Sequence, residues 1–269
     1  MDIIDRAHLL DAAGFSPPIY RYLPSAAVSE LIRRFWVPVW SLPSGAGSTQ
    51  RVLQYPSTQV VIADSYARFY GVVGGLSTVA LSESGWAVGA MLQPGAGFLV
   101  LGRSIAEVSD TYVELDPLLP DLTERIRMIM DPDPHAEAAH ATAIAAVEQA
   151  VGARGPLDDE GRLVNEVAAW VEGNDEVSQV AEICERYGVS ERSLQRLTRR
   201  RIGLSPKWLI QRRRLHRASE ELRAEPSGLA DLAARLGYAD QAHFTRDFRR
   251  VTAMTPRDFA DQAASFSPR

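Results

Sequence analysis

The chain has 269 residues, of which 46% are hydrophobic and 23% charged, as in globular proteins with room for two domains. Its formal net charge of -5 argues against nucleic acid only if read over the whole chain. Residues 175–269 hold 18 basic and 13 acidic side chains, whereas residues 1–174 hold 11 and 21. The N-terminal part is therefore acidic and the C-terminal part basic, and only the basic part has a charge suited to binding a polyanion.

Three sequence features lead us to expect a cytoplasmic protein. Cys184 is the single cysteine, which excludes an intrachain disulfide; we expect it to be buried and inert, with a redox switch as the alternative. The start, Met1–Asp5, has neither a basic segment nor an apolar signal core. The most apolar stretch, Trp86–Gly102, is interrupted by Gln93-Pro94 and by glycines, so it cannot form a membrane helix.

The first predicted element is a short helix, capped by Ser25 or Ser29, that runs through Arg34 into a stretch with two tryptophans. Large aromatics at this spacing either pack in a core or line a ligand pocket, and both alternatives stay open. The candidate ligand-binding residues of the N-terminal part are Trp36, Trp40, Tyr70 and Trp86.

After a flexible turn at Pro43–Ser48, the pattern changes to short runs rich in Val, Ile, Tyr and Leu, bounded by Pro, Gly, Ser or Asp. The predicted strands are Arg51–Tyr55, Gln59–Asp64, Ala67–Val73, Ser77–Leu81 and Trp86–Leu92. Strands of this length and spacing indicate an antiparallel sheet or a small barrel. The many glycines match neither the dinucleotide fingerprint nor the phosphate loop, so turns and bulges are the better interpretation.

Past Pro117 the chain is expected to be helical over Asp121–Met130, Pro134–Gly152 and Asp158–Glu172. The middle helix is rich in alanine and carries a stripe of Ile144, Val147 and Val151. Such a helix covers the sheet or contacts a second subunit, and we slightly favour a dimer contact. Gly173-Asn174-Asp175 marks the predicted domain boundary.

Two helix-turn-helix patterns follow. In the first, Val180–Tyr187 is a helix, Ser190 is an N-cap, and Glu191–Arg201 is a second helix with Leu194 and Leu197 inward. In the second, a helix from Leu229 ends at Gly237 because glycine adopts the left-handed conformation, and Asp240 caps a helix with Phe244 and Phe248 inward. Matching residues are 50 apart, including Leu194 and Phe244, Arg196 and Arg246, and Ser205-Pro206 and Thr255-Pro256. The sequence therefore contains an internal repeat.

A long helix over Lys207–Arg223 is predicted to link the repeats, with Trp208, Leu209, Leu215 and Leu222 packed on them. Ten basic residues and one acid lie between Ser190 and Arg217, a concentration of charge that attracts phosphates. We expect Arg212, Arg213, Arg214 and Arg217 to form a basic ridge on the linking helix, with at least one phosphate contact among them.

Residues 176–262 resemble the DNA-binding domain of the AraC/XylS transcription regulators, above all over Leu236–Phe248 and at Thr255-Pro256. The resemblance implies two recognition helices, joined by a long helix, that enter successive major-groove segments on one face of DNA. The sequence departs from the family at Thr198, where an aromatic is usual, at Ala253, where glycine is usual, and at Phe259-Ala260, where Tyr-Arg is common.

Recognition helices need side chains that reach base edges, such as arginine for guanine and glutamine for adenine. The two helices present such donors, and their N-termini at Ser190 and Asp240 offer backbone N–H groups to phosphates. The alternative for each residue is plain solvated surface. The predicted DNA-binding residues are Ser190, Arg192, Gln195, Arg196, Arg199, Arg200, Asp240, Gln241, Ala242, His243, Thr245, Arg246 and Arg249.

The segment Val88–Ala96 resembles the sensor-like N-terminal domain of some AraC-type regulators, which implies a regulatory domain whose ligand is unassigned. The predicted fold is α+β: an antiparallel or mixed β-rich domain over residues 1–116, a helical connector over 117–174, and an all-α double helix-turn-helix domain over 175–269.

The sequence thus predicts a regulator that binds double-stranded promoter DNA. Its expected partners are a small effector, with RNA polymerase and a second copy of the chain as further possibilities. No cofactor, metal or catalytic residue is expected: neither HExxH nor G-x-S-x-G occurs, and one cysteine excludes the metal-bound cysteine cluster of repair methyltransferases. An architectural DNA-binding or protein-interaction module without effector response is the alternative function.

Overall fold

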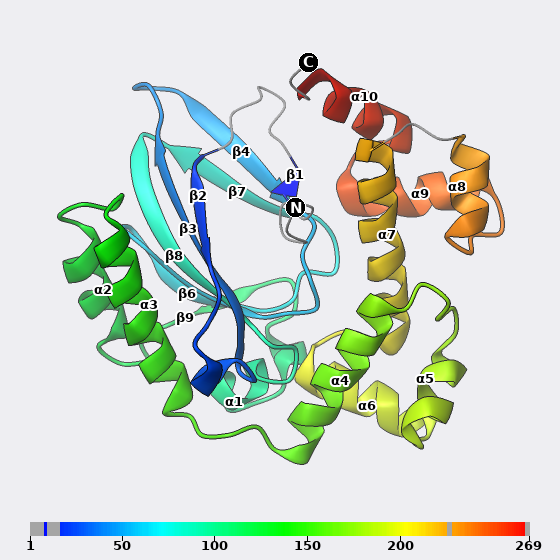
Figure 1. Ribbon diagram of the computed structural model, residues 1–269, viewed down its shortest axis with the longest axis horizontal. Helices are drawn as coiled ribbons and strands as arrows, with labels where there is room; N and C mark the ends of the chain where they lie inside the picture. Colours follow the sequence, from blue (N-terminus) through cyan, green and yellow to red (C-terminus); the bar gives the residue numbers. More distant parts are fainter. Residues whose placement is uncertain (1–7, 10–16, 225–227, 267–269) are drawn as a thin grey trace.

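The computed structural model describes residues 8–9, 17–224 and 228–266, so Met1–Asp5 lies outside the described residues. Antiparallel sheets and their covering helices form one side of the molecule, and a group of helices forms the other (Figure 1). The predicted α+β class, with a β-rich N-terminal part and a helical C-terminal part, is confirmed.

Every strand pairing in the two sheets is antiparallel. The larger sheet has the order β2 (Ile19–Tyr22), β3 (Ile32–Ser41), β8 (Ser84–Leu92), β5 (Gln59–Ala63), β6 (Ala67–Tyr70) and β9 (Tyr112–Glu114). The smaller sheet has the order β1 (His8–Leu9), β4 (Gly47–Val52) and β7 (Ser77–Ser82).

The predicted helix through Arg34 is wrong. Only a 3₁₀ turn, η1 (Ala26–Val28), is present, and β3 begins at Ile32. Strict alternation of buried Phe35, Val37 and Val39 with less buried neighbours suits a strand better than a helix. Another difference is that β4 starts at Gly47, inside the expected turn, and ends at Val52 rather than Tyr55.

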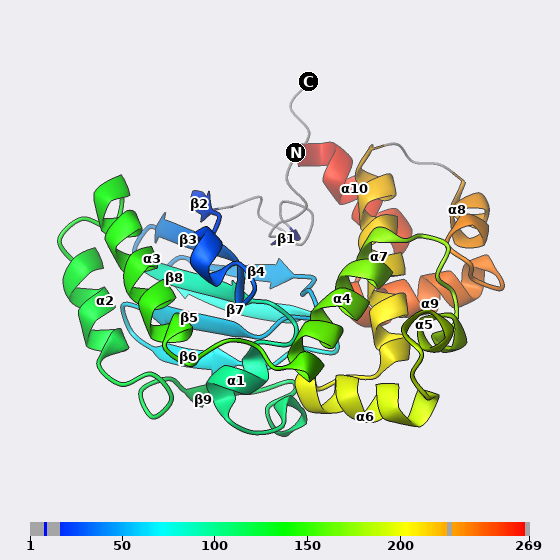
Figure 2. The same ribbon diagram turned by 60° about the horizontal axis from the view of Figure 1, so that its bottom comes forward.

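One face of the larger sheet is covered by helices. This face carries Phe35 on β3, Ile62 on β5 and Val88 on β8, all nearly inaccessible, and it is covered by α2 (Leu122–Met130) and α3 (Glu137–Gly152) (Figures 1 and 2). The short helices α1 (Gly97–Leu101) and η2 (Ile105–Glu107) complete this core.

The alanine-rich helix α3 packs inside the chain. Ile144, Val147 and Val151 are buried in the core beneath the larger sheet. The expected stripe therefore covers the sheet, and it is not the dimer contact that we favoured, because its apolar side chains are already buried within one chain.

The last connector helix, α4 (Asp159–Gly173), packs with the C-terminal helices although it precedes the expected boundary. Its Val164, Val167 and Val171 share one buried cluster with Ile183 and Leu194 of the first helix-turn-helix. The core of the C-terminal part therefore begins before residue 174.

The remaining helices build two small clusters along one long helix (Figure 1). They are α5 (Val180–Tyr187), α6 (Glu191–Arg201), α7 (Pro206–Ala224), α8 (Leu229–Arg235), α9 (Gln241–Thr252) and α10 (Pro256–Phe266). Within the described ranges, no helix has both the length and the apolar character required to cross a membrane.

Candidate nucleic-acid interface and ligand cavity

The first helix-turn-helix, α5 and α6, has the predicted N-cap at Ser190 and a glycine C-cap. Gly188 ends α5 with a φ of 63°, and the Ser190 hydroxyl accepts the Ser193 N–H over 3.2 Å at the start of α6. Leu194 and Leu197 are buried in the cluster with α4 and α7. The opposite face of α6 is exposed and presents Arg192, Gln195, Arg196 and Arg199.

The second unit, α8 and α9, repeats this construction. Gly237 follows α8 with a φ of 73°, and the Asp240 carboxylate accepts the His243 N–H over 2.6 Å. Phe244 and Phe248 are fully buried. The outer face of α9 exposes Gln241, Ala242, His243, Arg246 and Arg249, with Thr245 half-buried beside them.

Residues that lie 50 positions apart in the sequence occupy equivalent places in the two helix-turn-helix units. Leu194 and Phe244 are both completely buried at the same place in their helices. Gly203 and Ala253, also 50 residues apart, both have positive φ after α6 and α9. The repeat predicted from the sequence is therefore confirmed as two copies of one supersecondary unit.

Helix α7 joins the two units. Leu209 is buried in the first cluster, and Leu215 and Leu222 in the second, as the apolar pattern predicted. Ile210, which the prediction did not include, is also buried in the first cluster. A helix of 19 residues is about 28 Å long at 1.5 Å per residue. Because both ends are packed, α7 fixes the position of one recognition helix relative to the other.

The expected basic ridge on α7 is wrong. Arg212 is 2% exposed, and its Nη2 donates to the carbonyls of Val73, Gly74 and Gly75 at 3.3, 2.7 and 3.2 Å. Burial, against the opposing effect of Asp110, lowers the pKa of Arg212 to about 9.

Two further arginines of the ridge are also occupied inside the chain. Arg213 is buried and donates to the carbonyls of Asn174 and Val177. Arg217 lies within ion-pair distance of Asp175 and Glu220. Arg212 and Arg213 therefore hold the fold together, and Arg217 is exposed but engaged in surface ion pairs. The arginines of α6 and α9 supply further exposed positive charge.

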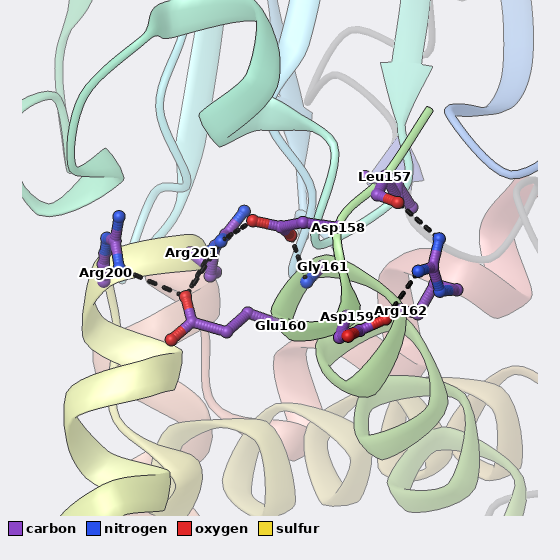
Figure 3. Close-up of polar contacts among 8 residues, drawn as sticks. All are labelled: Leu157, Asp158, Asp159, Glu160, Gly161, Arg162, Arg200 and Arg201. Atoms are coloured by element: carbon purple, nitrogen blue, oxygen red, sulfur yellow. Dashed lines mark hydrogen bonds and ion pairs between the residues drawn. The ribbon is translucent and has the colours of Figure 1, made fainter. Parts of the chain in front are cut away.

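Arg200 differs from the other predicted DNA-binding residues of α6. Its Nη1 lies 3.1 Å from the Oε2 atom of Glu160, at the start of α4 (Figure 3). Its guanidinium also lies over the Phe98 ring. Arg200 is exposed, as Arg196 is, but it also contacts the N-terminal part of the chain.

A cavity of about 180 Å³ lies between the two sheets. Trp36, Trp40 and Tyr70 line it, as predicted for ligand-binding residues. Residues of both sheets and their loops that the sequence did not single out complete the wall: Pro17, Ile19, Arg21, Arg34, Pro38, Gln50, Val52, Gln54, Gln59, Val61, Tyr66, Ser77, Val79, Leu81, Ala87 and Met91. Burial, with a smaller effect of Tyr70, raises the pKa of Tyr66 to about 12, so its phenol stays protonated.

Trp86 is not part of this cavity. It is buried in the core under α2 and α3, where its Nε1 donates to the Asp131 carboxylate over 3.2 Å. Successive strand residues point to opposite faces, so on β8 the cavity receives Ala87 and Met91, and Trp86 must face the helices. The alternation of side chains along the predicted strand would have separated Trp86 from the cavity-lining Ala87 and Met91.

These features define a class of protein: a β-rich domain with an internal cavity, joined to a double helix-turn-helix domain. Residues 183–262 match the family described as a helix-turn-helix domain, and residues 20–114 match a domain of unknown function (DUF6597). The chain is 35% identical over 104 residues to the HTH-type transcriptional activator RhaS of Escherichia coli strain SE11, a match that covers 38% of this chain and 37% of RhaS.

Two solved structures are also similar. A transcriptional regulator with an AraC-type DNA-binding domain from Chromobacterium violaceum is 27% identical, with a TM-score of 0.37 over 39% of this chain and 96% of that one. ToxT from Vibrio cholerae O395 is 9% identical, with a TM-score of 0.41 over 92% of this chain and 97% of ToxT. The C-terminal helix-turn-helix domain is of the AraC type, and the chain matches little more than a third of the length of its curated relatives.

Proposed function

We propose that the protein regulates transcription by binding specific sequences in double-stranded DNA through α6 and α9. The observation that supports this most is the repeat itself. Two capped helices, each with an exposed row of hydrogen-bond donors, are held by one rigid helix. Elements so arranged suit successive segments of the major groove.

In this proposal Arg196 grips guanine through its O6 and N7 atoms, and Gln195 and Gln241 pair with adenine. Gln195 is within 2.9 Å of the Glu191 carboxylate in the free protein, so it must exchange that bond for one to a base. The N–H groups at the starts of α6 and α9 hold phosphates and set the register.

We propose further that a small effector binds in the cavity between the sheets and alters DNA binding. The cavity is lined by aromatic and aliphatic side chains with a few polar groups, a composition typical of small-molecule sites. RNA polymerase and a second copy of the chain are further proposed partners.

Selection of bound duplexes from a random pool tests the DNA-binding proposal. Recovery of a consensus supports it, and Arg196→Ala should then cost about 1–3 kcal/mol and relax the preference at one position. Arg154→Ala is the matched control, because it removes the same charge from an exposed loop outside the helix-turn-helix units. Equal binding to all sequences would favour the architectural alternative.

Thermal-shift screening tests the effector. A compound that occupies the cavity should raise Tm in the wild type and lose this effect in Val61→Trp, which fills the space beside Trp36. A compound that stabilises both proteins equally binds elsewhere. If every compound that fits the cavity leaves Tm unchanged, the effector proposal fails while DNA binding stands.

A further inference from the structure

The last turn of α6 ends in three consecutive arginines that have different surroundings. Arg199 is exposed. Arg201 is 3% exposed and pairs with both Asp158 and Glu160, while Arg200 lies 3.1 Å from the same Oε2 atom of Glu160 (Figure 3). One carboxylate oxygen therefore receives hydrogen bonds from two guanidinium groups.

Arg201 is fixed in this cluster. Its Nη2 donates to Asp158 and, over 2.9 Å, to Glu160, and its guanidinium lies 4.2 Å from the centroid of the Phe98 ring. Burial opposes ionisation of Asp158, but hydrogen bonds from Arg201 and from the Gly161 N–H hold the pKa of Asp158 below its usual value. Arg201 thus ties α6 to α4 and to the sheet domain.

The contact between Arg200 and Glu160 is different because water reaches both side chains. Arg200 is 48% exposed and Glu160 is 45% exposed. Exposed ion pairs contribute little to stability, so a competing anion can replace the carboxylate at small cost. Asp158 would still neutralise Arg201 after such an exchange.

Arg200 also lies in line with the predicted base-reading residues. Arg192, Arg196 and Arg200 follow one another at intervals of four, so they form a row along α6. A DNA strand that passes beside Arg192 and Arg196 brings its phosphates toward the end of the helix where Arg200 lies.

We propose that Glu160 masks Arg200, so that the carboxylate and a DNA phosphate compete for one guanidinium group and the contact is autoinhibitory. The inference rests on the proposed DNA binding and concerns how the Glu160–Arg200 contact regulates that binding. A phosphate that takes Arg200 leaves Glu160 paired with Arg201 alone. Any shift of α4 away from α6 would release Arg200 without this competition.

The experiment compares Glu160→Gln with Asp159→Asn. Both changes remove one negative charge from the first turn of α4, but Asp159 is fully exposed and pairs with Arg162, not with α6. Affinity for a mixed-sequence duplex is measured as a function of salt. We expect Glu160→Gln to bind about two- to fivefold more tightly, the range that an exposed ion pair supplies, with a salt slope steeper by about 0.9. Asp159→Asn should bind as the wild type does.

A double-mutant cycle with Arg200→Gln completes the test. The gain from Glu160→Gln should vanish in the Arg200→Gln background. Equal effects of Glu160→Gln and Asp159→Asn, or a gain that persists without Arg200, would overturn the masking. Failure of the wild type and every variant to bind any duplex would instead overturn the proposed function, whereas binding by Glu160→Gln alone supports the masking.

Discussion

Ala253 has a φ of 59°, in the left-handed region where a Cβ atom clashes with the backbone. The matching residue of the first repeat, Gly203, has a φ of 93° and no such penalty. The departure from the family pattern at this position therefore does not change the backbone. It stores strain after the second recognition helix.

Replacing Ala253 with glycine should relieve this strain. Glycine also loses more conformational freedom on folding, so we expect a net gain of about 0.5–1 kcal/mol in the free energy of unfolding. Urea denaturation measures it. The reciprocal change, Gly203→Ala, should cost roughly 2 kcal/mol or more, because its Cβ would also lie 2.3 Å from the Ser109 hydroxyl. Destabilisation by Ala253→Gly would contradict the argument.

His216 makes the stability of the protein sensitive to acid. Its ring is stacked on Tyr55 with centroids 4.4 Å apart, and burial, reinforced by the charge of Arg212, lowers its pKa from 6.5 to about 3. Between these values the unfolded chain binds a proton that the folded chain does not. The stability that the neutral ring contributes is therefore complete above pH 6.5 and is lost progressively as the pH falls toward 3.

We predict that His216→Gln flattens this dependence. The free energy of unfolding of the wild type should fall by more than that of the variant between pH 7 and pH 5, a window above the usual range in which carboxylates titrate. Denaturant titrations at fixed ionic strength measure both slopes. Identical slopes would show that His216 titrates normally.

The arginines of α7 show that the type of a residue does not reveal whether its side chain is buried. A run such as Arg212-Arg213-Arg214 indicates a charged surface, yet two of its members are buried. Their acceptors are backbone carbonyls of residues 36 to 139 positions away in the chain. Backbone carbonyls are present at every position and leave no mark in the sequence, so these contacts were not predictable.

At the scale of elements, the helix boundaries of the C-terminal part were predictable because local chemistry sets them. The caps at Ser190 and Asp240 and the left-handed glycine at 237 all occur where the sequence placed them. The N-terminal strands were predicted with shifted ends, and β3 was partly taken for a helix. Strand ends depend on pairing with distant strands, for which neighbouring residues give little information.

Loss of the cap at Asp240 should weaken α9 specifically. Asp240→Ala removes the acceptor of the His243 N–H and should cost about 1 kcal/mol of stability, whereas Asp240→Asn, which also caps well, should cost much less. Amide hydrogen exchange should show faster exchange in the first turn of α9 in the alanine variant only. Equal exchange in both variants would mean that tertiary packing alone holds this end.

At the scale of the whole molecule, the sequence predicted two differently charged parts but not how they join. The join includes the pairing of α6 with the start of α4 and the contact of α7 with the segment between β6 and β7. In that contact the Trp208 Nε1 atom donates to the Gly74 carbonyl over 3.1 Å, beside the bonds from Arg212. The contacts of α7 span more than a hundred residues of sequence and those between α6 and α4 about forty, so no local pattern encodes them.

Arg212→Met should loosen this join without unfolding either part, because the side chain keeps most of its apolar length but loses three hydrogen bonds. We expect faster amide exchange over residues 71–76 and a thermal transition that broadens or separates into two. Lys207→Met is the control, since it removes an exposed charge from the same helix. A single sharp transition and unchanged exchange in Arg212→Met would show that other contacts suffice.

The segment that Arg212 holds consists of six residues, Gly71–Leu76, and the residues on either side of it, Tyr70 and Ser77, both line the cavity. We therefore expect a change in the space between the sheets to displace an anchor point of α7. Because α7 is packed against both helix-turn-helix units, α6 and α9 should then move together. Under the proposed function, two DNA half-sites would gain or lose their fit simultaneously.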